Sequence, residues 1–158
     1  MQPHRIDFEI TETALVNDFA QAQRALQIFR ELGAKTSLDD FGTGYSSLSH
    51  VRQLPLDKLK IDRSFVNDIE THQPSRDIVK AVLDLSHNLH FECVVEGVET
   101  ESQANMVRQL GGHVMQGYYF AKPMRPEEID SYLTGERLAA LEDRQARVVI
   151  EEPKRVYG

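Results

Sequence analysis

The chain alternates short apolar runs with longer amphipathic stretches, and this alternation restricts the folds open to it. Strand-like runs are expected at residues 6–11, 35–40, 58–62, 91–98 and 113–120. Helices are expected over residues 13–32, over 45–54, from Pro74 onward, between Thr100 and Gly111, and over 126–133. Units in this order predict a parallel sheet with right-handed crossovers.

Two architectures have such a sheet: an open doubly wound sheet and a (β/α)8 barrel. Strands of a doubly wound sheet usually read as continuous apolar runs. Here Asp7 and Glu9 alternate with apolar residues in the first run, and Lys58 and Lys60 do so in the third, so one face of the sheet is polar. A complete barrel needs roughly 250 residues. We therefore predict an α/β fold that is a partial (β/α)8 TIM-type barrel, with about five β/α units and its N-terminal strands absent.

Composition limits the function classes. The net charge of −7 and the lack of a dense basic run disfavour DNA or RNA as partners. No apolar run is long enough for a membrane segment or a signal peptide, so we predict a cytoplasmic location. Cys93 is alone in the sequence, cannot form an internal disulfide, and is expected in the core.

Polar side chains stand near the ends of the predicted strands. They are Glu9, Asp39, Asp40, Lys60, Glu96 and Gln116. Any one of them could be a surface residue, but successive parallel strands deliver such a set to one rim of the sheet. Oxygen ligands suit a hard divalent cation, and the scattered histidines argue against zinc. Neighbouring Asp39 and Asp40 would face opposite sides unless the strand ends there, which the glycines that follow permit.

Longer motifs carry a family resemblance. The segments are F-E-I-T-E at 8–12, D-D-F-G-T-G-Y-S-S at 39–47, L-K-I-D-R-S-F at 59–65, V-V-E-G-V-E-T at 94–100 and Q-G-Y-Y-F-A-K-P at 116–123. The chain resembles the C-terminal part of an EAL domain, the family of bacterial cyclic di-GMP phosphodiesterases, over residues 1–133. The family's Glu-x-Leu motif with its Arg, and its metal-ligand Asn, have no counterpart in this sequence.

The resemblance implies roles for individual residues. Glu9, Asp39, Asp40 and Glu96 resemble the metal ligands, and Asp40 resembles the ligand shared with the second of two Mg²⁺ or Mn²⁺ ions. Lys60, Glu96 and Asp40 resemble the catalytic groups: Lys60 would hold the attacking water or a phosphate oxygen, and Glu96 would be a general base. Gln116 resembles the amide that supports the bound substrate. Glu12 and Glu99 resemble groups that steady the loop after Asp40 and the lysine.

The implied activity is hydrolysis of cyclic di-GMP to linear pGpG. Because ligands of the family site have no counterpart here, the single chain is expected to be weakly active or inactive as an enzyme. A non-catalytic module that binds cyclic di-GMP or another protein is the alternative. A phosphoacceptor receiver domain is less favoured, because its acidic pair should follow the first strand and Lys60 comes too early.

The resemblance and the unclosed sheet also bear on assembly. The resemblance to EAL domains implies a dimer that forms partly through the loop after the Asp pair. In addition, uncovered strand edges pair with other chains. A homodimer or self-association through loop 41–47 and the open sheet edges is therefore expected. Residues 134–158 lie beyond the resemblance and are expected to be a charged helical or flexible tail.

Overall fold

Five parallel strands form one sheet in the computed structural model, which describes residues 2–44 and 48–134. In chain order they are β1 (Asp7–Thr11), β2 (Lys35–Phe41), β3 (Lys58–Ile61), β4 (Glu92–Val95) and β5 (Val114–Met115). Within the described residues, each strand pairs only with its neighbours in sequence, in the order β1-β2-β3-β4-β5. A doubly wound sheet reverses its strand order at a switch point, whereas a barrel does not. The predicted α/β fold of barrel type is confirmed.

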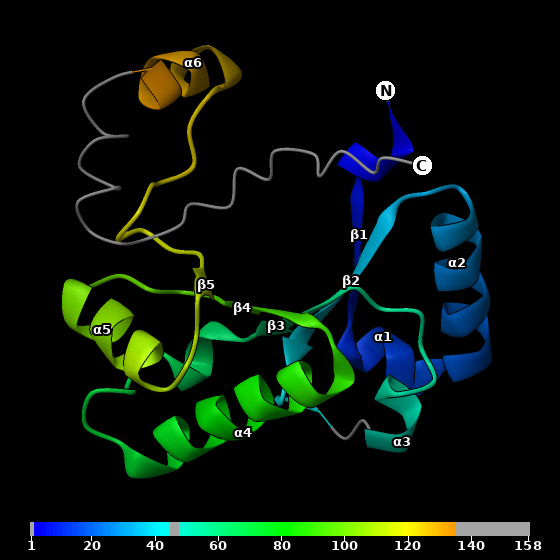
Figure 1. The fold of residues 1–158 in the computed structure, drawn as a ribbon, viewed down its shortest axis with the longest axis horizontal. Coiled ribbons are helices and arrows are strands. Elements are labelled where there is room, and N and C mark those ends of the chain that lie inside the picture. The colour runs from blue at the N-terminus through cyan, green and yellow to red at the C-terminus, as the bar shows by residue number, and fades with distance from the viewer. Residues whose placement is uncertain (1, 45–47, 135–158) are drawn as a thin grey trace.

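Helices connect the strands in the expected alternation. They are α1 (Glu12–Asn17), α2 (Phe19–Glu31), α3 (Leu48–Val51), α4 (Gln73–Leu89), α5 (Glu101–Gln109) and α6 (Pro126–Thr134), with short 3-10 turns η1 (Pro3–Arg5) and η2 (Arg63–Phe65). Figure 1 shows α4 and α5 on one side of the curved sheet and α6 on the other. In the described part of the chain, no helix is long and apolar enough to cross a membrane.

The prediction of one helix over 13–32 is wrong, because Asp18 divides it. Asp18 has non-helical backbone angles, φ −150° and ψ 84°. Its Oδ1 accepts a hydrogen bond of 2.9 Å from the backbone N–H of Gln21, so it caps α2 while it ends α1.

Two strands are shorter than predicted. Beyond Val95, the backbone of Gly97 takes a positive φ of 73°, which ends β4. Beyond Met115, the carbonyl of Gln116 accepts a hydrogen bond of 3.1 Å from the N–H of Val98, which lies in the β4–α5 loop. The predicted extension of the last strand to residue 120 is therefore wrong.

The core lies between the sheet and the helices. Leu38, Leu59, Ile61 and Val95 from the strands are fully buried. They belong to one cluster with Leu26, Val79, Ala104 and Val107 of the helices. Burial of this apolar face holds the strands in place. Cys93 packs against the same cluster, and burial raises the pKa of its thiol to about 11, while a hydrogen bond with Ser86 opposes the shift. The polar face that the alternation predicted is the site described next.

Candidate functional site

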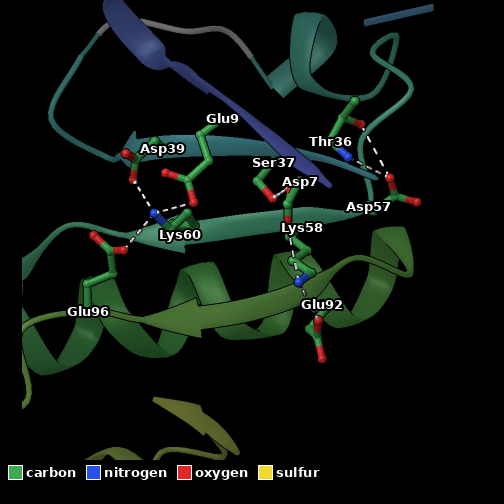
Figure 2. A network of polar contacts seen from close by, with 10 residues as sticks. All are labelled: Asp7, Glu9, Thr36, Ser37, Asp39, Asp57, Lys58, Lys60, Glu92 and Glu96. Carbon is green, nitrogen blue, oxygen red and sulfur yellow. Dashed lines mark hydrogen bonds and ion pairs between the residues drawn. The ribbon is translucent and has the colours of Figure 1, made fainter. Parts of the chain in front are cut away.

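Lys60 stands at the centre of three carboxylates. Its Nζ lies 2.9 Å from Glu9 Oε1, 3.3 Å from Asp39 Oδ1 and 2.8 Å from Glu96 Oε1. Figure 2 shows these side chains converging on the lysine from neighbouring parts of the sheet. Glu9 comes from β1, Asp39 from β2, Lys60 from β3, and Glu96 directly follows β4. The sheet register brings them together, since the last residue of β1 pairs with Asp39 and Lys60 pairs with a residue of β4.

The surrounding carboxylates keep Lys60 charged. Burial of this side chain, which is 8% exposed, acts to lower its pKa and is the largest single influence. The hydrogen bonds with Glu9 and Glu96 and the negative charges of Glu96 and Asp39 together outweigh burial. The pKa of Lys60 therefore lies above its ordinary value, and the ammonium form persists at neutral pH.

Glu96 has the opposite balance. Burial raises the pKa of its carboxyl most, and the negative charges of Asp39 and Glu9 raise it further, against the lowering effect of Lys60. A carboxylate with a raised pKa accepts a proton more readily than an exposed one. The site thus combines a fixed cation with a carboxylate suited to proton transfer.

Asp40 enters this region through an irregularity in β2. The expectation that the strand must end at the Asp pair is wrong, because β2 continues to Phe41. Instead the β2–β3 register shifts between Leu38 and Phe41, and Asp40 takes a left-handed φ of 56°. Its N–H donates to Asp39 Oδ1 at 3.0 Å. Burial, followed by the charges of Asp39 and Asp62, raises the pKa of the Asp40 carboxyl, and Lys60 opposes the shift.

Glu12 holds the loop that follows Asp40. Its side chain is 2% exposed, and Oε2 accepts hydrogen bonds from the backbone N–H groups of Gly42 and Gly44, both at 3.0 Å. The contact expected between Glu12 and this loop is present. Glu99 differs: it is exposed, and no hydrogen bond or ion pair joins its carboxylate to Lys60 among the residues described. The role expected of Glu99 in steadying the loop and the lysine therefore stays a prediction.

Gln116 lies at a cavity beside the lysine. The cavity has a volume of about 260 Å³, and its lining includes Glu9, Lys60, Met115, Gln116 and Phe120. Gln116 directly follows β5, and its backbone N–H donates to the carbonyl of Val95 at 2.9 Å. Polar groups from β1, β3 and the end of β5 thus share one hollow on the polar face of the sheet.

A second polar cluster on this face was not predicted as a cluster. Lys58 Nζ lies 3.2 Å from Asp7 Oδ2 and 3.5 Å from Glu92 Oε2, and Ser37 Oγ donates to Asp7 Oδ1 at 2.7 Å. Figure 2 shows this cluster toward the starts of the strands, away from Lys60. The alternation of charged and apolar residues in β1 and β3 was the signal that could have found it.

The donor chemistry of the Lys60 cluster suits a hard divalent cation. Glu9, Asp39 and Glu96 converge on one point, and all offer carboxylate oxygens, the ligands preferred by Mg²⁺ and Mn²⁺. In the structure as described, the point of convergence is taken by the Lys60 ammonium. No group of three or more His, Cys, Asp or Glu in the described ranges is arranged to hold a metal ion. Glu9, Asp39 and Glu96 are thus suitable ligands for Mg²⁺ or Mn²⁺ by residue type, but in this geometry they form ion pairs with Lys60.

Comparison with known proteins places this arrangement in a family. The model of the EAL domain matches residues 1–123. The chain belongs to the EAL domain family. Because receiver domains are a different family, the receiver alternative is excluded.

Curated relatives of this EAL chain are much longer proteins. It is 42% identical over 135 residues to the cyclic di-GMP phosphodiesterase NbdA of Pseudomonas aeruginosa, covering 85% of the chain and 17% of NbdA. It is 35% identical over 133 residues to the signaling protein YkoW of Bacillus subtilis, covering 84% of the chain and 17% of YkoW. The chain thus spans about a sixth of the length of these relatives.

Solved structures of EAL proteins have the same fold over most of the chain. The PaMucR phosphodiesterase in complex with c-di-GMP matches with a TM-score of 0.78 and 36% identity, over 82% of this chain and 52% of that one. Klebsiella pneumoniae BlrP1 with manganese and cyclic di-GMP matches with a TM-score of 0.73 and 34% identity, over 78% of this chain and 31% of that one. Another BlrP1 structure is a complex with calcium and cyclic di-GMP, so structures of this neighbour contain divalent cations together with the nucleotide.

Proposed function

We propose that this EAL chain carries part of the site of a metal-dependent phosphodiesterase that hydrolyses cyclic di-GMP to linear pGpG. The observation that carries the proposal is the position of Lys60, whose Nζ lies within 3.3 Å of Glu9, Asp39 and Glu96. The proposal is supported by relatives named as cyclic di-GMP phosphodiesterases and by structural neighbours solved with that nucleotide.

In this proposal, Glu9, Asp39, Asp40 and Glu96 hold the divalent cations, Mg²⁺ or Mn²⁺. When bound, such ions lower the pKa of a water and stabilise charge that develops on phosphate oxygens. The four side chains offer only carboxylate oxygens, and the pKa values of Asp40 and Glu96 are raised mainly by burial and further by the negative charges of neighbouring carboxylates. A cation would relieve this repulsion.

The other groups act on the substrate and the water. Lys60 keeps its positive charge at neutral pH, so it can hold the attacking water or a phosphate oxygen. Glu96 can accept the proton of the attacking water, since its raised pKa makes it a better base than an exposed carboxylate. Gln116, at the cavity beside Lys60, can support the bound nucleotide with its amide. Glu12 fixes the loop after Asp40 through two backbone hydrogen bonds, and Glu99 keeps its expected role only as a prediction.

A non-catalytic module that binds cyclic di-GMP or another protein is the second candidate. The observation that favours it is the engagement of Glu9, Asp39 and Glu96 by Lys60, together with the absence of a metal-holding group in the part of the chain that the structure describes. Such a chain would bind the nucleotide without turnover.

The experiment that separates the two is a paired assay of binding and turnover. Purified chain is incubated with cyclic di-GMP and Mn²⁺, and pGpG is measured by chromatography, with equilibrium dialysis of the nucleotide alongside. Asp40→Asn and Lys60→Met should abolish turnover, whereas Lys80→Met removes a lysine of α4 that pairs with Asp84 outside the cavity and should not. Binding without turnover in the unaltered chain supports the second candidate. Neither binding nor turnover would refute the phosphodiesterase and the nucleotide-binding module, and would leave only a module that binds another protein.

The proposal includes an assembly and a location. We propose that residues 1–133 form the EAL part and 134–158 a separate tail, which lies outside the described residues apart from position 134. We also propose a homodimer or self-association through loop 41–47, of which 45–47 lie outside the description, and through the sheet edges at β1 and β5. Light scattering over a concentration series tests this self-association, and a constant monomer mass would contradict it.

We also propose that the chain is cytoplasmic, which cell fractionation can test.

A further inference from the structure

We infer that Gln103 is a positioning residue, which ties the loop that carries Glu96 to the segment that follows Lys60 in the chain. The Gln103 side chain is 7% exposed, although it belongs to the first turn of α5. Its Oε1 accepts hydrogen bonds from the backbone N–H groups of Glu99, at 2.8 Å, and Thr100, at 3.1 Å. Its Nε2 donates to the carbonyl of Val66 at 3.3 Å. One amide thus joins the β4–α5 loop to the chain just after η2.

Helix capping alone does not explain this arrangement. A capping box requires the Gln103 side chain to accept from the N–H of Thr100, while Thr100 Oγ1 accepts from the N–H of Gln103 at 3.1 Å. Glu serves as well as Gln at this position of a capping box. An ionised Glu can only accept hydrogen bonds, whereas the amide of Gln accepts from two N–H groups at its oxygen and donates to a carbonyl from its nitrogen. The contact with Val66 therefore uses the one property that Gln has and Glu lacks.

The two segments that Gln103 joins both begin at the Lys60 cluster. Lys60 lies near the end of β3, and Glu96 follows β4, where its N–H donates to the carbonyl of Ile61 at 3.1 Å. One residue later, a Cβ on Gly97 would lie 2.3 Å from the Cβ of Arg63, so the loop backbone runs directly against η2. The loop after Glu96 is thus held against the segment after Lys60 at its start by backbone contacts and at its end by Gln103.

The same loop also contacts the segment of Gln116. The N–H of Val98 donates to the carbonyl of Gln116 at 3.1 Å, and the carbonyl of Val98 accepts from the N–H of Tyr119 at 3.0 Å. A Cβ on Gly117 would lie 2.0 Å from the carbonyl oxygen of Val98, which leaves no room for the loop to shift. A displacement of this loop would therefore move the environments of both Glu96 and Gln116.

The inference rests on the proposed function only because Lys60 and Glu96 are the proposed catalytic groups. Its test does not require the chain to hydrolyse cyclic di-GMP. The readout is the side-chain ammonium signal of Lys60 in ¹H–¹⁵N NMR spectra. An ammonium that is nearly buried and paired with three carboxylates exchanges its protons slowly, and Lys60→Met identifies the signal by removing it. Failure of the phosphodiesterase proposal would leave this signal unchanged.

Three variants separate positioning from capping. Gln103→Met removes all three hydrogen bonds, Gln103→Glu keeps the two accepted bonds and loses the donation to Val66, and Thr100→Ala removes a cap of the same helix without touching Val66. We expect both Gln103 variants to lose at least half of the Lys60 signal intensity and Thr100→Ala to keep it. An unchanged signal in Gln103→Glu, or an equal loss in Thr100→Ala, would overturn the inference.

A measurement on the unaltered chain covers the case in which a variant does not fold. If Gln103 holds the loop, the amide protons of Glu99 and Thr100 should exchange with solvent as slowly as that of Val107 in the buried part of α5. Exchange of these two amides at the rate of an exposed loop would also overturn the inference.

Discussion

Glu12 offers the sharpest test of how the loop after Asp40 is held. Its Oε2 accepts two backbone hydrogen bonds at 3.0 Å, from Gly42 and Gly44. A hydrogen bond to a charged group contributes about 1.5–3 kcal/mol, and a neutral one about 0.5–1.5 kcal/mol. Both glycines are exposed, so water can replace the lost acceptor and the lower values apply. We expect Glu12→Ala to lower the free energy of unfolding by about 3 kcal/mol. Glu12→Gln, whose carbonyl keeps both bonds in neutral form at about 0.5 kcal/mol each, should lower it by about 2 kcal/mol.

The assay is urea denaturation followed by circular dichroism, with amide hydrogen exchange of Gly42 and Gly44 as a local readout. Glu101→Ala is the matched control, because Glu101 also lies in the first turn of a helix but is exposed. It should cost less than about 1 kcal/mol, the value of a favourable charge near a helix N-terminus. A Glu12→Ala variant as stable as this control would refute the reasoning, as would a Gln variant as unstable as the Ala variant.

Three further predictions concern stability. Because the folded-state pKa of Cys93 is about 11 against an ordinary 9.0, the folded chain retains this proton in that interval while the unfolded chain loses it, and stability falls as pH rises. Urea midpoints at pH 9 and 11 should show a decrease of up to about 2 kcal/mol that Cys93→Ala lacks. Gly117→Ala should destabilise the chain by about 3 kcal/mol or prevent folding, since its Cβ would meet the Val98 backbone. Gly33→Ala has space for its Cβ but places alanine at a left-handed φ of 81°, so it should cost only about 1 kcal/mol; a thermal melt decides. Asp18→Ala should cost about 1 kcal/mol through loss of the α2 cap, and Asp18→Asn should restore most of it in the same melt.

The sequence predicts those features that depend on neighbouring residues. The strand and helix alternation follows from residue periodicity, and the capping box at Thr100 and Gln103 follows from residue types at a fixed spacing. The break at Asp18 was missed because apolar residues recur at helical spacing on both sides of it. The length of β5 was overestimated because the backbone of Gln116 pairs with Val98, a loop residue, and strand propensity contains no information about such a partner.

The partners of Lys60 depend on the register of four strands, which no local pattern specifies. The sequence indicates that polar groups meet at one rim, but it does not indicate that Glu9, Asp39 and Glu96 all surround the Lys60 ammonium. The unexpected shift at Asp40 has the same origin. We expected β2 to end at the Asp pair, but the β2–β3 register shifts there instead and Asp40 takes a left-handed φ. Such a shift depends on the pairing of two strands, which the residues of β2 alone do not specify.

The charge of this cluster constrains how the proposed substrate can bind. One ammonium stands among three carboxylates, and Asp40 adds a further acidic group close by, so negative charge on the polar face is not fully compensated. A phosphodiester is itself an anion, and like charges in a partly buried site repel it. Lys60 cannot offset this alone, because its charge is already shared among Glu9, Asp39 and Glu96. If cyclic di-GMP binds at this cluster as proposed, additional cations should accompany it, and its affinity should rise with divalent ion concentration.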